Sequence, residues 1–276
     1  MKALAEYNNS GLHFEPSEIS MSDYLDYWLE NYVELNLRTN TIAGYKGIVE
    51  NYLKPSLGIY KLKSLTPSIL QNYINKKYIN GSSKSMLKRI SSVLNLSLKY
   101  AVHPCKFIKE NPMQYISMPK YEKKSEEFIK TVTLKEFDNI IDRFPETTDY
   151  YLPLMIGFHT GCRIGEVLAL TKDDIDFTNN RIHITKTYYR MNGEDIITTP
   201  KTEQSVRTID IPEFLKNEVA DYVSRIYACT GSQRLFPVVA EAVQHKLKRE
   251  CAKSGIKQIR VHDLRHSHVA YLINQG

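Results

Sequence analysis

The stretch HTGCRIGEVLALTKDDIDF, residues 159–177, joins an apolar run to a segment in which apolar and polar residues alternate. Its first half, CRIGEVLAL, predicts a helix that starts near Arg163. Backbone N–H groups and the helix dipole favour an anion at such a start, so Arg163 stands where a negative group would bind. Glu166 follows three residues later, where it can hold the Arg163 side chain. An ordinary surface salt pair is the alternative for this spacing.

Downstream of this stretch the apolar period changes to two, which is typical of strands. Asn192-Gly193 predicts a hairpin turn between the first two strands. A capping box formed by Thr133 and Glu136 predicts a helix before this region. The C-terminal part is therefore expected to be α+β, mainly helical with a small antiparallel β-sheet. The predicted strands are RIHITKTYY, DIITTPKT and RTIDIP, at 181–189, 195–202 and 207–212, and later helices begin near Glu213 and Ala240.

Residues 20–110 keep a helical period and predict a small all-helical domain of four or five helices. Pro55 is expected to end the second helix, because proline has no backbone N–H to donate. The candidate N-terminal residues of these helices are Ser20 or Ser22, Thr39, Thr66 followed by Pro67, and Ser82 or Ser83.

The charged stretch MPKYEKKSEEFIK, residues 118–130, has few bulky apolar residues and predicts an interdomain linker. The predicted division is a leader at 1–15, a helical domain at 16–117, the linker, and an α+β domain at 131–276. Hydrophobic residues make up 42% and charged residues 25% of the chain, which is typical of a soluble globular protein. No apolar run approaches membrane-spanning length, so no membrane partner is expected. The four cysteines lack CxxC spacing, which argues against a zinc site or a disulfide framework.

Positive charge is concentrated in one part of the chain. Residues 51–120 hold twelve Lys and Arg side chains against one acidic side chain, whereas residues 1–50 carry a net charge of −5 and residues 121–276 are balanced. Such an excess is typical of a surface that lies on nucleic-acid phosphates, and a basic surface without a partner is the alternative. The candidate DNA-binding residues are Arg38, Thr39, Asn40, Thr41, Lys46, Lys61, Lys63, Lys76, Lys77, Lys84, Lys88 and Arg89. For Thr39, the alternative to DNA binding is that it only caps a helix.

Three further residues carry groups that could act on a phosphate. Lys201 lies in TTPKTEQSVR between two predicted strands, and His262 and Arg265 stand three residues apart in RVHDLRHSHVAYLINQG. Together with Arg163 they form a chemically coherent set. Two arginines can grip phosphate oxygens, a lysine can protonate a leaving alkoxide, and a histidine can move a proton at neutral pH. The set predicts transesterification at a phosphodiester without a metal or other cofactor, because no acidic cluster offers magnesium ligands.

The segments HTGCRIGEVLALTKDDIDF, TTPKTEQSVRTIDIP and VHDLRHSHVAYLI together resemble motifs of the tyrosine recombinases, in the branch of phage and conjugative-transposon integrases. The resemblance covers about residues 15–276. It implies a helical core-binding domain and a catalytic domain that clamp double-stranded DNA between them. It also implies DNA cutting through a 3′-phosphotyrosine bond that frees a 5′-hydroxyl. The catalytic residues that it implies are Arg163, Lys201, His262 and Arg265, with Glu166 as the acidic support of Arg163.

The biological role that this resemblance implies is the integration and excision of a mobile element by site-specific recombination. The expected partners are double-stranded DNA and further copies of the protein on that DNA. The expected location is the bacterial cytoplasm, in association with the nucleoid. Because the bond energy is kept in the covalent protein–DNA link, no ATP, metal or other cofactor is expected.

The sequence departs from the family pattern near both ends. The nucleophilic tyrosine of the family and a further His or Trp follow the last motif by about two helices, whereas eleven residues follow Arg265 here. We therefore expect no nucleophile in this chain, with Tyr271 packed in the core and His266 and His268 in structural or surface roles. The start MKALAEYNNSG resembles a remnant of an arm-site-binding domain. The chain is thus expected to bind DNA without cleaving it alone. The alternatives are a non-catalytic regulator that occupies recombination sites and, more remotely, a type IB topoisomerase.

Overall fold

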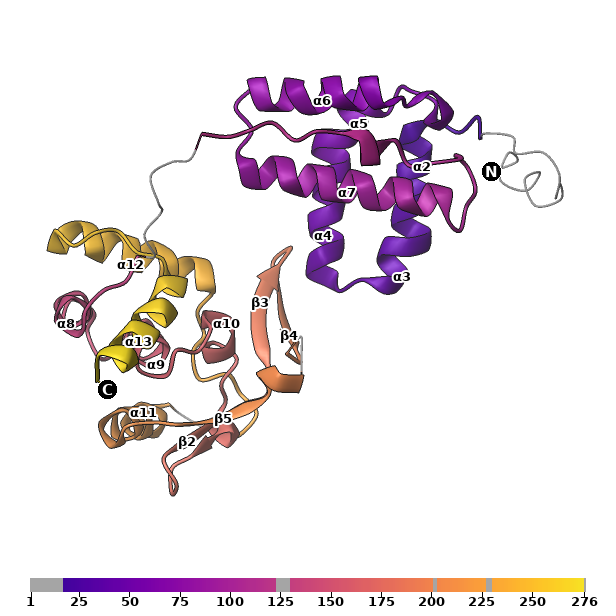
Figure 1. Cartoon of the computed structure of the whole chain (residues 1–276). Coiled ribbons are helices and arrows are strands. Elements are labelled where there is room, and N and C mark those ends of the chain that lie inside the picture. Colours follow the sequence, from indigo (N-terminus) through magenta and orange to yellow (C-terminus); the bar gives the residue numbers. More distant parts are fainter. Residues whose placement is uncertain (1–16, 123–129, 201–202, 227–229, 276) are drawn as a thin grey trace. The chain divides into compact units, whose positions relative to one another are not determined.

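Two separate hydrophobic cores organise the chain, one in unit 1 (residues 1–123) and one in unit 2 (residues 124–276). The computed structural model describes residues 17–122, 130–200, 203–226 and 230–275 (Figure 1). The predicted leader and most of the predicted linker lie outside these described residues. The division into four segments drawn from the sequence therefore stays a prediction.

Unit 1 is all-helical, as the sequence predicts (Figure 1), and three of its helices begin at expected caps. The side-chain oxygens of Ser20, Thr66 and Ser83 each accept the backbone N–H three residues later, so Ser20 and Ser83 are the caps among the candidates. The elements are α2 (Met21–Trp28) continuing through a π turn (Leu29–Val33) into α3 (Glu34–Asn36), α4 (Thr39–Ile48) continuing through a π turn (Val49–Leu53) into α5 (Lys54–Leu57), α6 (Pro67–Ile79), α7 (Lys84–Val102), and 3₁₀ turns at Leu62–Ser64 and Pro112–Tyr115.

Pro55 does not end the second helix, and this prediction is wrong. The helical run continues through Pro55 to Leu57 as α5. In the π turn before it, the Lys54 N–H donates to the Val49 carbonyl five residues back. Pro55 thus falls in the first turn of a new α-helical segment, where a missing backbone N–H is tolerated.

Aromatic rings join the helices of unit 1. Trp28 is fully buried and stacks with Tyr32 at 6.2 Å and with Tyr45 of α4 at 5.9 Å between ring centroids. The Tyr24 hydroxyl donates to the Ser97 carbonyl in α7. The first helix is therefore held by side-chain contacts to both α4 and α7.

Unit 2 combines helices with short strands, as predicted (Figure 1). The capping box of Thr133 and Glu136 is present at the start of α8. The helices are α8 (Leu134–Ile141), α9 (Tyr151–Thr160), α10 (Ile164–Val167), α11 (Glu213–Arg225), α12 (Ala240–Ser254) and α13 (Val261–Gln275). The strands are β1 (Ile175–Asp176), β2 (Arg181–Ile184), β3 (Thr187–Met191), β4 (Glu194–Thr198) and β5 (Arg207–Asp210), with 3₁₀ turns at Lys172–Asp174 and Glu203–Ser205.

The strands form two antiparallel sheets rather than the one expected. β1, β2 and β5 make one sheet, and β3 and β4 make a separate hairpin. The predicted strand 181–189 is two strands, β2 and β3. The break between them contains Lys186, whose amine pairs with buried Asp174 at 2.6 Å. The alternating pattern runs through this break, so the sequence alone does not mark it. The turn at Asn192-Gly193 is confirmed, and both residues have positive φ.

The helix expected from CRIGEVLAL is much shorter than predicted. α10 covers only Ile164–Val167, and the chain leaves it at Leu168. Residues 167–170 are all buried, and the Leu170 carbonyl accepts the backbone N–H of Leu235 from a distant segment at 2.8 Å.

Candidate active site

A left-handed turn between α9 and α10 positions Arg163. Gly161 ends α9 at φ 63°, and a Cβ at this position would lie 2.7 Å from the ring of His268. Arg163 follows in an extended conformation as the residue before α10. Arg163 therefore stands at a helix start, as expected, but α10 has only four residues and its dipole adds little to the binding of an anion. We expect most of the affinity for an anion here to come from side chains.

Glu166 is the buried centre of an arginine cluster. Its side chain is 4% exposed, and Oε1 lies 2.9 Å from Nη1 of Arg163. Oε2 accepts the backbone N–H of Arg163 at 3.0 Å and Nη2 of Arg207 at 2.8 Å. Burial raises the pKa of Glu166, but the hydrogen bonds from Arg207 and Arg163 outweigh it and lower that pKa below its usual value. Glu166 is thus an ionised carboxylate that holds the Arg163 side chain. Arg163 remains 53% exposed, and its guanidinium has further N–H donors for a ligand.

Arg207 is a site residue that the sequence reasoning missed. It opens β5, its side chain is 27% exposed, and its Nη2 also lies 3.6 Å from Sγ of Cys162. The carboxylate of Glu166 raises the pKa of Arg207 further above its usual value. No local spacing indicates this contact, because the two residues are 41 positions apart.

Helix α13 is held by hydrogen bonds at its first two turns. The fully buried Asp263 accepts the backbone N–H of Arg260 at 2.8 Å and also binds its guanidinium. The Val261 N–H donates to Oε1 of Gln244 in α12, and Ser267 Oγ accepts the Val132 N–H. These contacts fix the rotation of α13 and hence the direction of its two candidate catalytic residues.

Arg265 reaches back to the turn that carries Arg163. Its Nη1 donates to the Gly161 carbonyl at 2.6 Å, across 104 residues of sequence. The two predicted arginines are therefore brought to the same turn. Both guanidinium groups have further N–H donors besides those that bind Glu166 and the Gly161 carbonyl.

His262 lies one turn before His266 on α13, and their rings are 5.1 Å apart. Reduced solvation, followed by the charges of His266, Arg260 and Arg265, lowers the pKa of His262. His262 is consequently a neutral imidazole at pH 7, able to accept a proton. The i,i+4 spacing could have placed His266 beside it. His268 has the expected structural role, since its ring packs against Gly161.

The remaining catalytic prediction, Lys201, lies outside the described residues, between β4 and β5. Tyr271 is partly exposed rather than packed in the core as expected, and its ring centroid lies 6.3 Å from that of Phe158 in α9.

The candidate DNA-binding residues of unit 1 divide into two groups. Arg38, not Thr39, is the residue before α4, so Thr39 does not cap this helix. Arg38, Thr39 and Asn40 are exposed, and Thr41 is partly exposed. The guanidinium of the exposed Arg89 lies 3.3 Å from the Cβ position of Gly44, which places the first turns of α7 beside α4. We define the α4–α7 face by Thr39, Asn40, Lys84, Lys88 and Arg89.

Other candidate lysines are engaged by the protein itself. Lys61 and Lys63 both bind Glu18, and Lys46 binds Glu34 at 2.5 Å. Lys77 lies 5.4 Å from the ring centroids of Tyr52 and Tyr73. By contrast, Lys76, Lys84 and Lys88 form no ion pair with any described residue. The structure thus favours the α4–α7 face among the predicted contacts.

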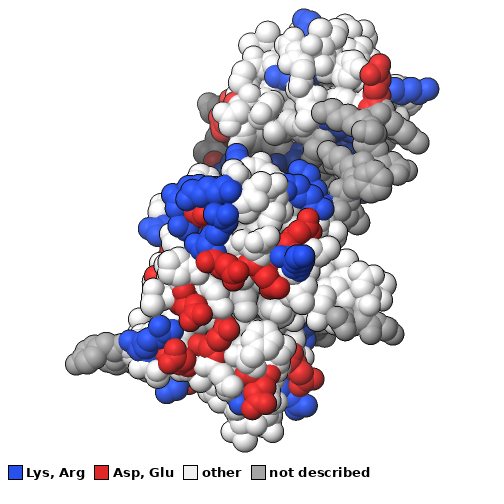
Figure 2. All heavy atoms as spheres, turned by 90° about the vertical axis from the view of Figure 1, so that its left-hand side faces the viewer, with Lys and Arg blue, Asp and Glu red and all other residues white. Residues whose placement is uncertain are grey.

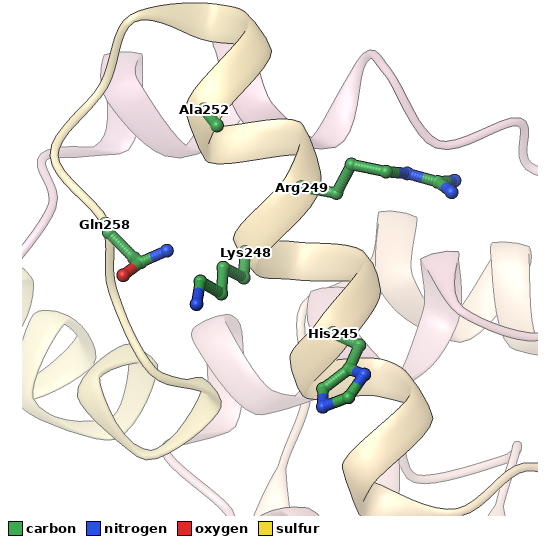
Figure 3. A pocket seen from close by; sticks show the side chains of 5 residues that line it. All are labelled: His245, Lys248, Arg249, Ala252 and Gln258. Carbon is green, nitrogen blue, oxygen red and sulfur yellow. The ribbon is translucent and has the colours of Figure 1, made fainter.

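Unit 2 also has a basic surface that the sequence reasoning missed. Figure 2 shows Lys and Arg side chains gathered at the level of α12. On this helix a hollow of about 350 Å³ is lined by His245, Lys248, Arg249, Ala252 and Gln258 (Figure 3). The sequence did not indicate this surface, because residues 121–276 have a net charge of zero. The acidic residue Glu250 of α12 has a side chain that is 4% exposed and lies within 3.6 Å of three basic side chains. Its negative charge is therefore neutralised beneath the surface.

Within the described residues, no three or more His, Cys, Asp and Glu side chains are grouped to hold a metal ion. No helix in the same part of the chain has the length and apolar character needed to cross a membrane.

Comparisons with known proteins identify a family for both units of the chain. The phage integrase N-terminal SAM-like domain matches residues 20–78, and the phage integrase family matches residues 127–276. The ICEBs1 integrase of Bacillus subtilis is 27% identical over 265 residues, which cover 88% of this chain and 69% of the relative. A XerC-like tyrosine recombinase of Caldanaerobacter subterraneus is 30% identical over 227 residues, which cover 76% of this chain and 57% of the relative.

Solved structures show the same fold. The Tn1549 transposon integrase in complex with transposon right end DNA has a TM-score of 0.77 at 20% identity, covering 94% of this chain and 88% of that chain. A lambda integrase dimer bound to a COC′ core site has a TM-score of 0.69 at 16% identity, covering 93% and 71%. The two family matches together span both units and include both arginine motifs of the site. The chain therefore belongs to the phage integrase family, the tyrosine recombinases that cut and rejoin DNA.

Proposed function

We propose that this protein integrates and excises a mobile element by site-specific recombination. A tyrosine oxygen attacks a DNA phosphorus, a 3′-phosphotyrosine bond forms, and the bond to the 5′ oxygen breaks. The 5′-hydroxyl of a partner strand then reverses the reaction at the same phosphorus. The attacking tyrosine is a role that we assign to no described residue.

The roles at the phosphate follow from the side chains present. Arg163 and Arg265 hold the non-bridging oxygens and stabilise the charge that grows on the pentacoordinate phosphorus. Lys201 gives its proton to the leaving 5′ oxygen, and His262 takes part in the transfer of the tyrosine proton. Glu166 keeps Arg163 in position. No step of this proposal uses a metal or another cofactor.

The observation that carries the proposal is the contact of Arg265 with the Gly161 carbonyl at 2.6 Å. It brings a guanidinium from α13 to the turn that presents Arg163. Two arginines from distant segments at one turn are suited to a single group with several anionic oxygens, which a phosphodiester is.

Unit 1 supplies much of the DNA affinity in this proposal. The α4–α7 face offers exposed Lys84, Lys88 and Arg89 for phosphates. The family, together with solved integrases such as a lambda integrase tetramer on a Holliday junction, supports double-stranded DNA and further copies of the protein as partners. We place the protein in the bacterial cytoplasm, on the nucleoid.

The test is a nicked suicide DNA substrate, which traps the covalent adduct because the 5′ fragment diffuses away. The full-length protein should form a protein–DNA adduct that survives denaturing gel electrophoresis. The Arg163→Ala variant should bind DNA nearly as well and form no adduct, because one phosphate contact among many adds little affinity. The same contact can add several kcal/mol in the transition state. DNA binding without any adduct would instead identify a non-catalytic regulator.

A further inference from the structure

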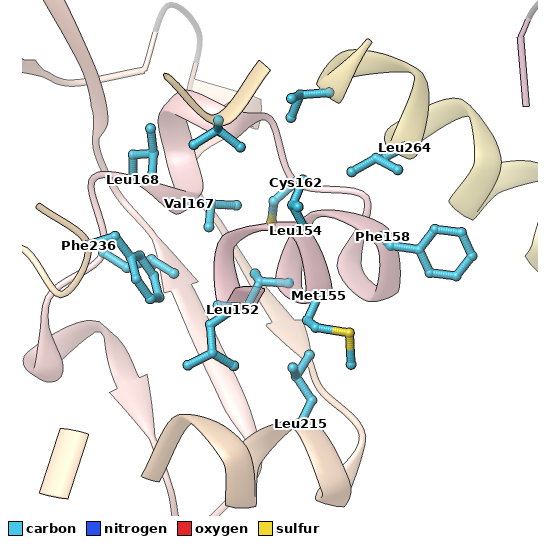
Figure 4. Close-up of a cluster of buried hydrophobic side chains, with 14 of the residues drawn as sticks. Leu152, Leu154, Met155, Phe158, Cys162, Val167, Leu168, Leu215, Phe236 and Leu264 are labelled. Atoms are coloured by element: carbon cyan, nitrogen blue, oxygen red, sulfur yellow. The ribbon is translucent and has the colours of Figure 1, made fainter. Parts of the chain in front are cut away.

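The segment that carries Arg163 and Glu166 is fixed at both ends in the hydrophobic core of unit 2. Cys162 precedes Arg163, Val167 follows Glu166, and both of these flanking residues are buried in the cluster drawn in Figure 4. The backbone N–H of Arg163 is also bound, because it donates to Oε2 of Glu166 at 3.0 Å. The backbone at Arg163 is therefore held in place, and the direction and net charge of its guanidinium depend on the surrounding side chains.

Glu166 directs the Arg163 guanidinium, but by itself it would also cancel the positive charge of that group. One carboxylate beside one guanidinium forms a neutral pair, which attracts a phosphate only weakly. A carboxylate with two available oxygens also favours two parallel N–H bonds from a guanidinium, which leaves fewer donors for a ligand. An anion at Arg163 is therefore bound well only if another cation offsets Glu166.

Arg207 is positioned as that cation. Its Nη2 donates to Oε2 of Glu166 at 2.8 Å, whereas Nη1 of Arg163 donates to Oε1 at 2.9 Å. The two carboxylate oxygens are thus divided between the two guanidinium groups. The three charged side chains together keep one net positive charge, and the exposed side of Arg163 remains available to a phosphate.

Arg207 is itself held by the protein. Its Nη1 donates to the Ser205 carbonyl at 3.1 Å, and its Nη2, besides binding the carboxylate, lies 3.6 Å from Sγ of Cys162. Its backbone pairs with Ile184 of β2 in the three-stranded sheet. Both terminal nitrogens of Arg207 are consequently engaged within unit 2, and its side chain joins the sheet to the segment that presents Arg163.

We propose that Arg207 is a positioning residue for DNA cleavage: it offsets the charge of Glu166, so that this carboxylate directs Arg163 to the phosphate without neutralising it. This inference rests on the proposed function. Arg207 touches no reacting atom, and its effect on the reaction passes through Glu166 and Arg163. Removal of Arg207 frees Oε2 for a second hydrogen bond from the Arg163 guanidinium, which turns this group from the phosphate and leaves a neutral pair.

The rate of adduct formation on the suicide substrate, measured with the full-length protein at saturating DNA, tests this role. Arg207→Met should form the adduct roughly 10- to 100-fold more slowly, because a misdirected and neutralised guanidinium stabilises the transition state less. Its Kd for uncleaved DNA should stay within about threefold of the wild type, since one charge among many contacts adds little affinity. Arg207→Lys keeps the charge and should recover part of the lost rate, whereas Arg207→Gln keeps an N–H donor without the charge and should not.

A double-mutant cycle with Glu166 separates this role from a direct contact between Arg207 and DNA. When Glu166 is already replaced by glutamine, no negative charge is left for Arg207 to offset. Adding Arg207→Met to Glu166→Gln should therefore change the rate by less than about threefold, against roughly 10- to 100-fold for the same substitution in the wild type. A direct phosphate contact would be lost to the same extent in both backgrounds.

A matched control and a second variant keep the test independent of folding. Arg181→Met removes another arginine–carboxylate pair of the same sheet, Arg181 with Asp210 at 2.8 Å, and should cleave at the wild-type rate. Arg207→Gln enters the same double-mutant cycle as a less disruptive variant than Arg207→Met. The final amount of adduct gives the active fraction of each preparation, so a poorly folded variant lowers this amount and leaves the rate to report the site.

The outcomes separate the two proposals. Equal losses of rate for the Arg207 variants in both backgrounds, or no loss in either, would overturn the positioning role and leave the proposed function standing. A wild-type rate in Arg207→Gln would overturn the charge offset in the same way. A wild-type protein that forms no adduct would refute the proposed function itself.

Discussion

Replacing Glu166 by glutamine removes the negative charge that Arg163 and Arg207 share. The carboxylate accepts three hydrogen bonds, two from Arg163 and one from Arg207. Glutamine keeps one acceptor oxygen, and its amide N–H groups would face a guanidinium that can only donate. The substitution therefore breaks contacts without a change of side-chain size.

The expected loss of stability follows from the exposure of the partners. Loss of one partner of a buried ion pair costs roughly 3–5 kcal/mol. Arg163 is 53% and Arg207 27% exposed, so water solvates both guanidinium groups partly after the change. We therefore expect unit 2 to lose about 2–3 kcal/mol at pH 7. DNA cleavage should fall as well, because Arg163 loses the contact that directs it.

Urea unfolding can measure this loss for unit 2 separately. Circular dichroism follows both units, whereas Trp28, the single tryptophan of the sequence, reports unit 1 through its fluorescence. Asp174→Asn is a matched control: its side chain is 8% exposed, pairs with Lys186 at 2.6 Å and accepts a backbone N–H three residues back. This control should cost similar stability and leave DNA cleavage unchanged.

The pH dependence gives the prediction its sign. The folded-state pKa of Glu166 lies below the ordinary value of 4.5, so the unfolded chain binds its proton first as the pH falls. The stabilisation is complete above pH 4.5 and is lost as the pH falls through the lower folded-state value. The difference in unfolding free energy between wild type and Glu166→Gln should therefore become smaller in acid. A difference that is absent at pH 7, or as large at pH 4 as at pH 7, would refute the role given to this carboxylate.

Three further predictions concern other parts of the molecule. Burial and the nearby His268 lower the pKa of His159 to about 4 from 6.5, so between these pH values only the unfolded chain gains the proton, and stability falls as pH falls. His159→Phe should remove this acid loss of up to about 3 kcal/mol, measured by urea unfolding at pH 7 and pH 4.5. Gly165→Ala should push the hairpin away from α10, because an added Cβ would lie 2.8 Å from the Tyr188 carbonyl, and should slow DNA cleavage in the suicide-substrate assay; an unchanged rate would contradict the close approach. Removing three charges from the α4–α7 face should weaken binding to every sequence and make the slope of log K against log salt less steep by about 2.7, as fluorescence anisotropy over a salt series would show; an unchanged slope would take this face out of the interface. That triple variant changes Lys84, Lys88 and Arg89.

Local hydrogen bonds are the part of the fold that the sequence predicts well. The caps Ser20, Thr66 and Ser83 and the capping box of Thr133 and Glu136 each join residues three positions apart. Such contacts depend on side-chain chemistry and spacing alone, both of which are visible in a sequence. The Asn192-Gly193 turn is predictable for the same reason.

Contacts between distant segments are the part that a single sequence does not predict. Ile182 of β2 pairs with Ile209 of β5, although the hairpin β3–β4 lies between them in the chain. Arg207 binds Glu166 across 41 residues. Arg234 is less visible still, since three of its acceptors are backbone carbonyls, which carry no sequence signature. The three segments that resemble the family's motifs were recognisable because each motif is local, whereas the residues that join these segments are far apart in the sequence.

The charges around the site match the charge of the reaction. Glu166 offsets one of its two arginines, so this cluster keeps one net positive charge, and Arg265 adds a second because its contact is a neutral carbonyl. His262 is neutral at pH 7. A phosphodiester carries one negative charge and its pentacoordinate transition state two, so the two net positive charges of the arginine groups, to which a protonated Lys201 would add one more, complement the transition state better than the ground state. Glu166→Gln would add a third positive charge, which should tighten binding of uncleaved DNA while the misdirected Arg163 slows its cleavage.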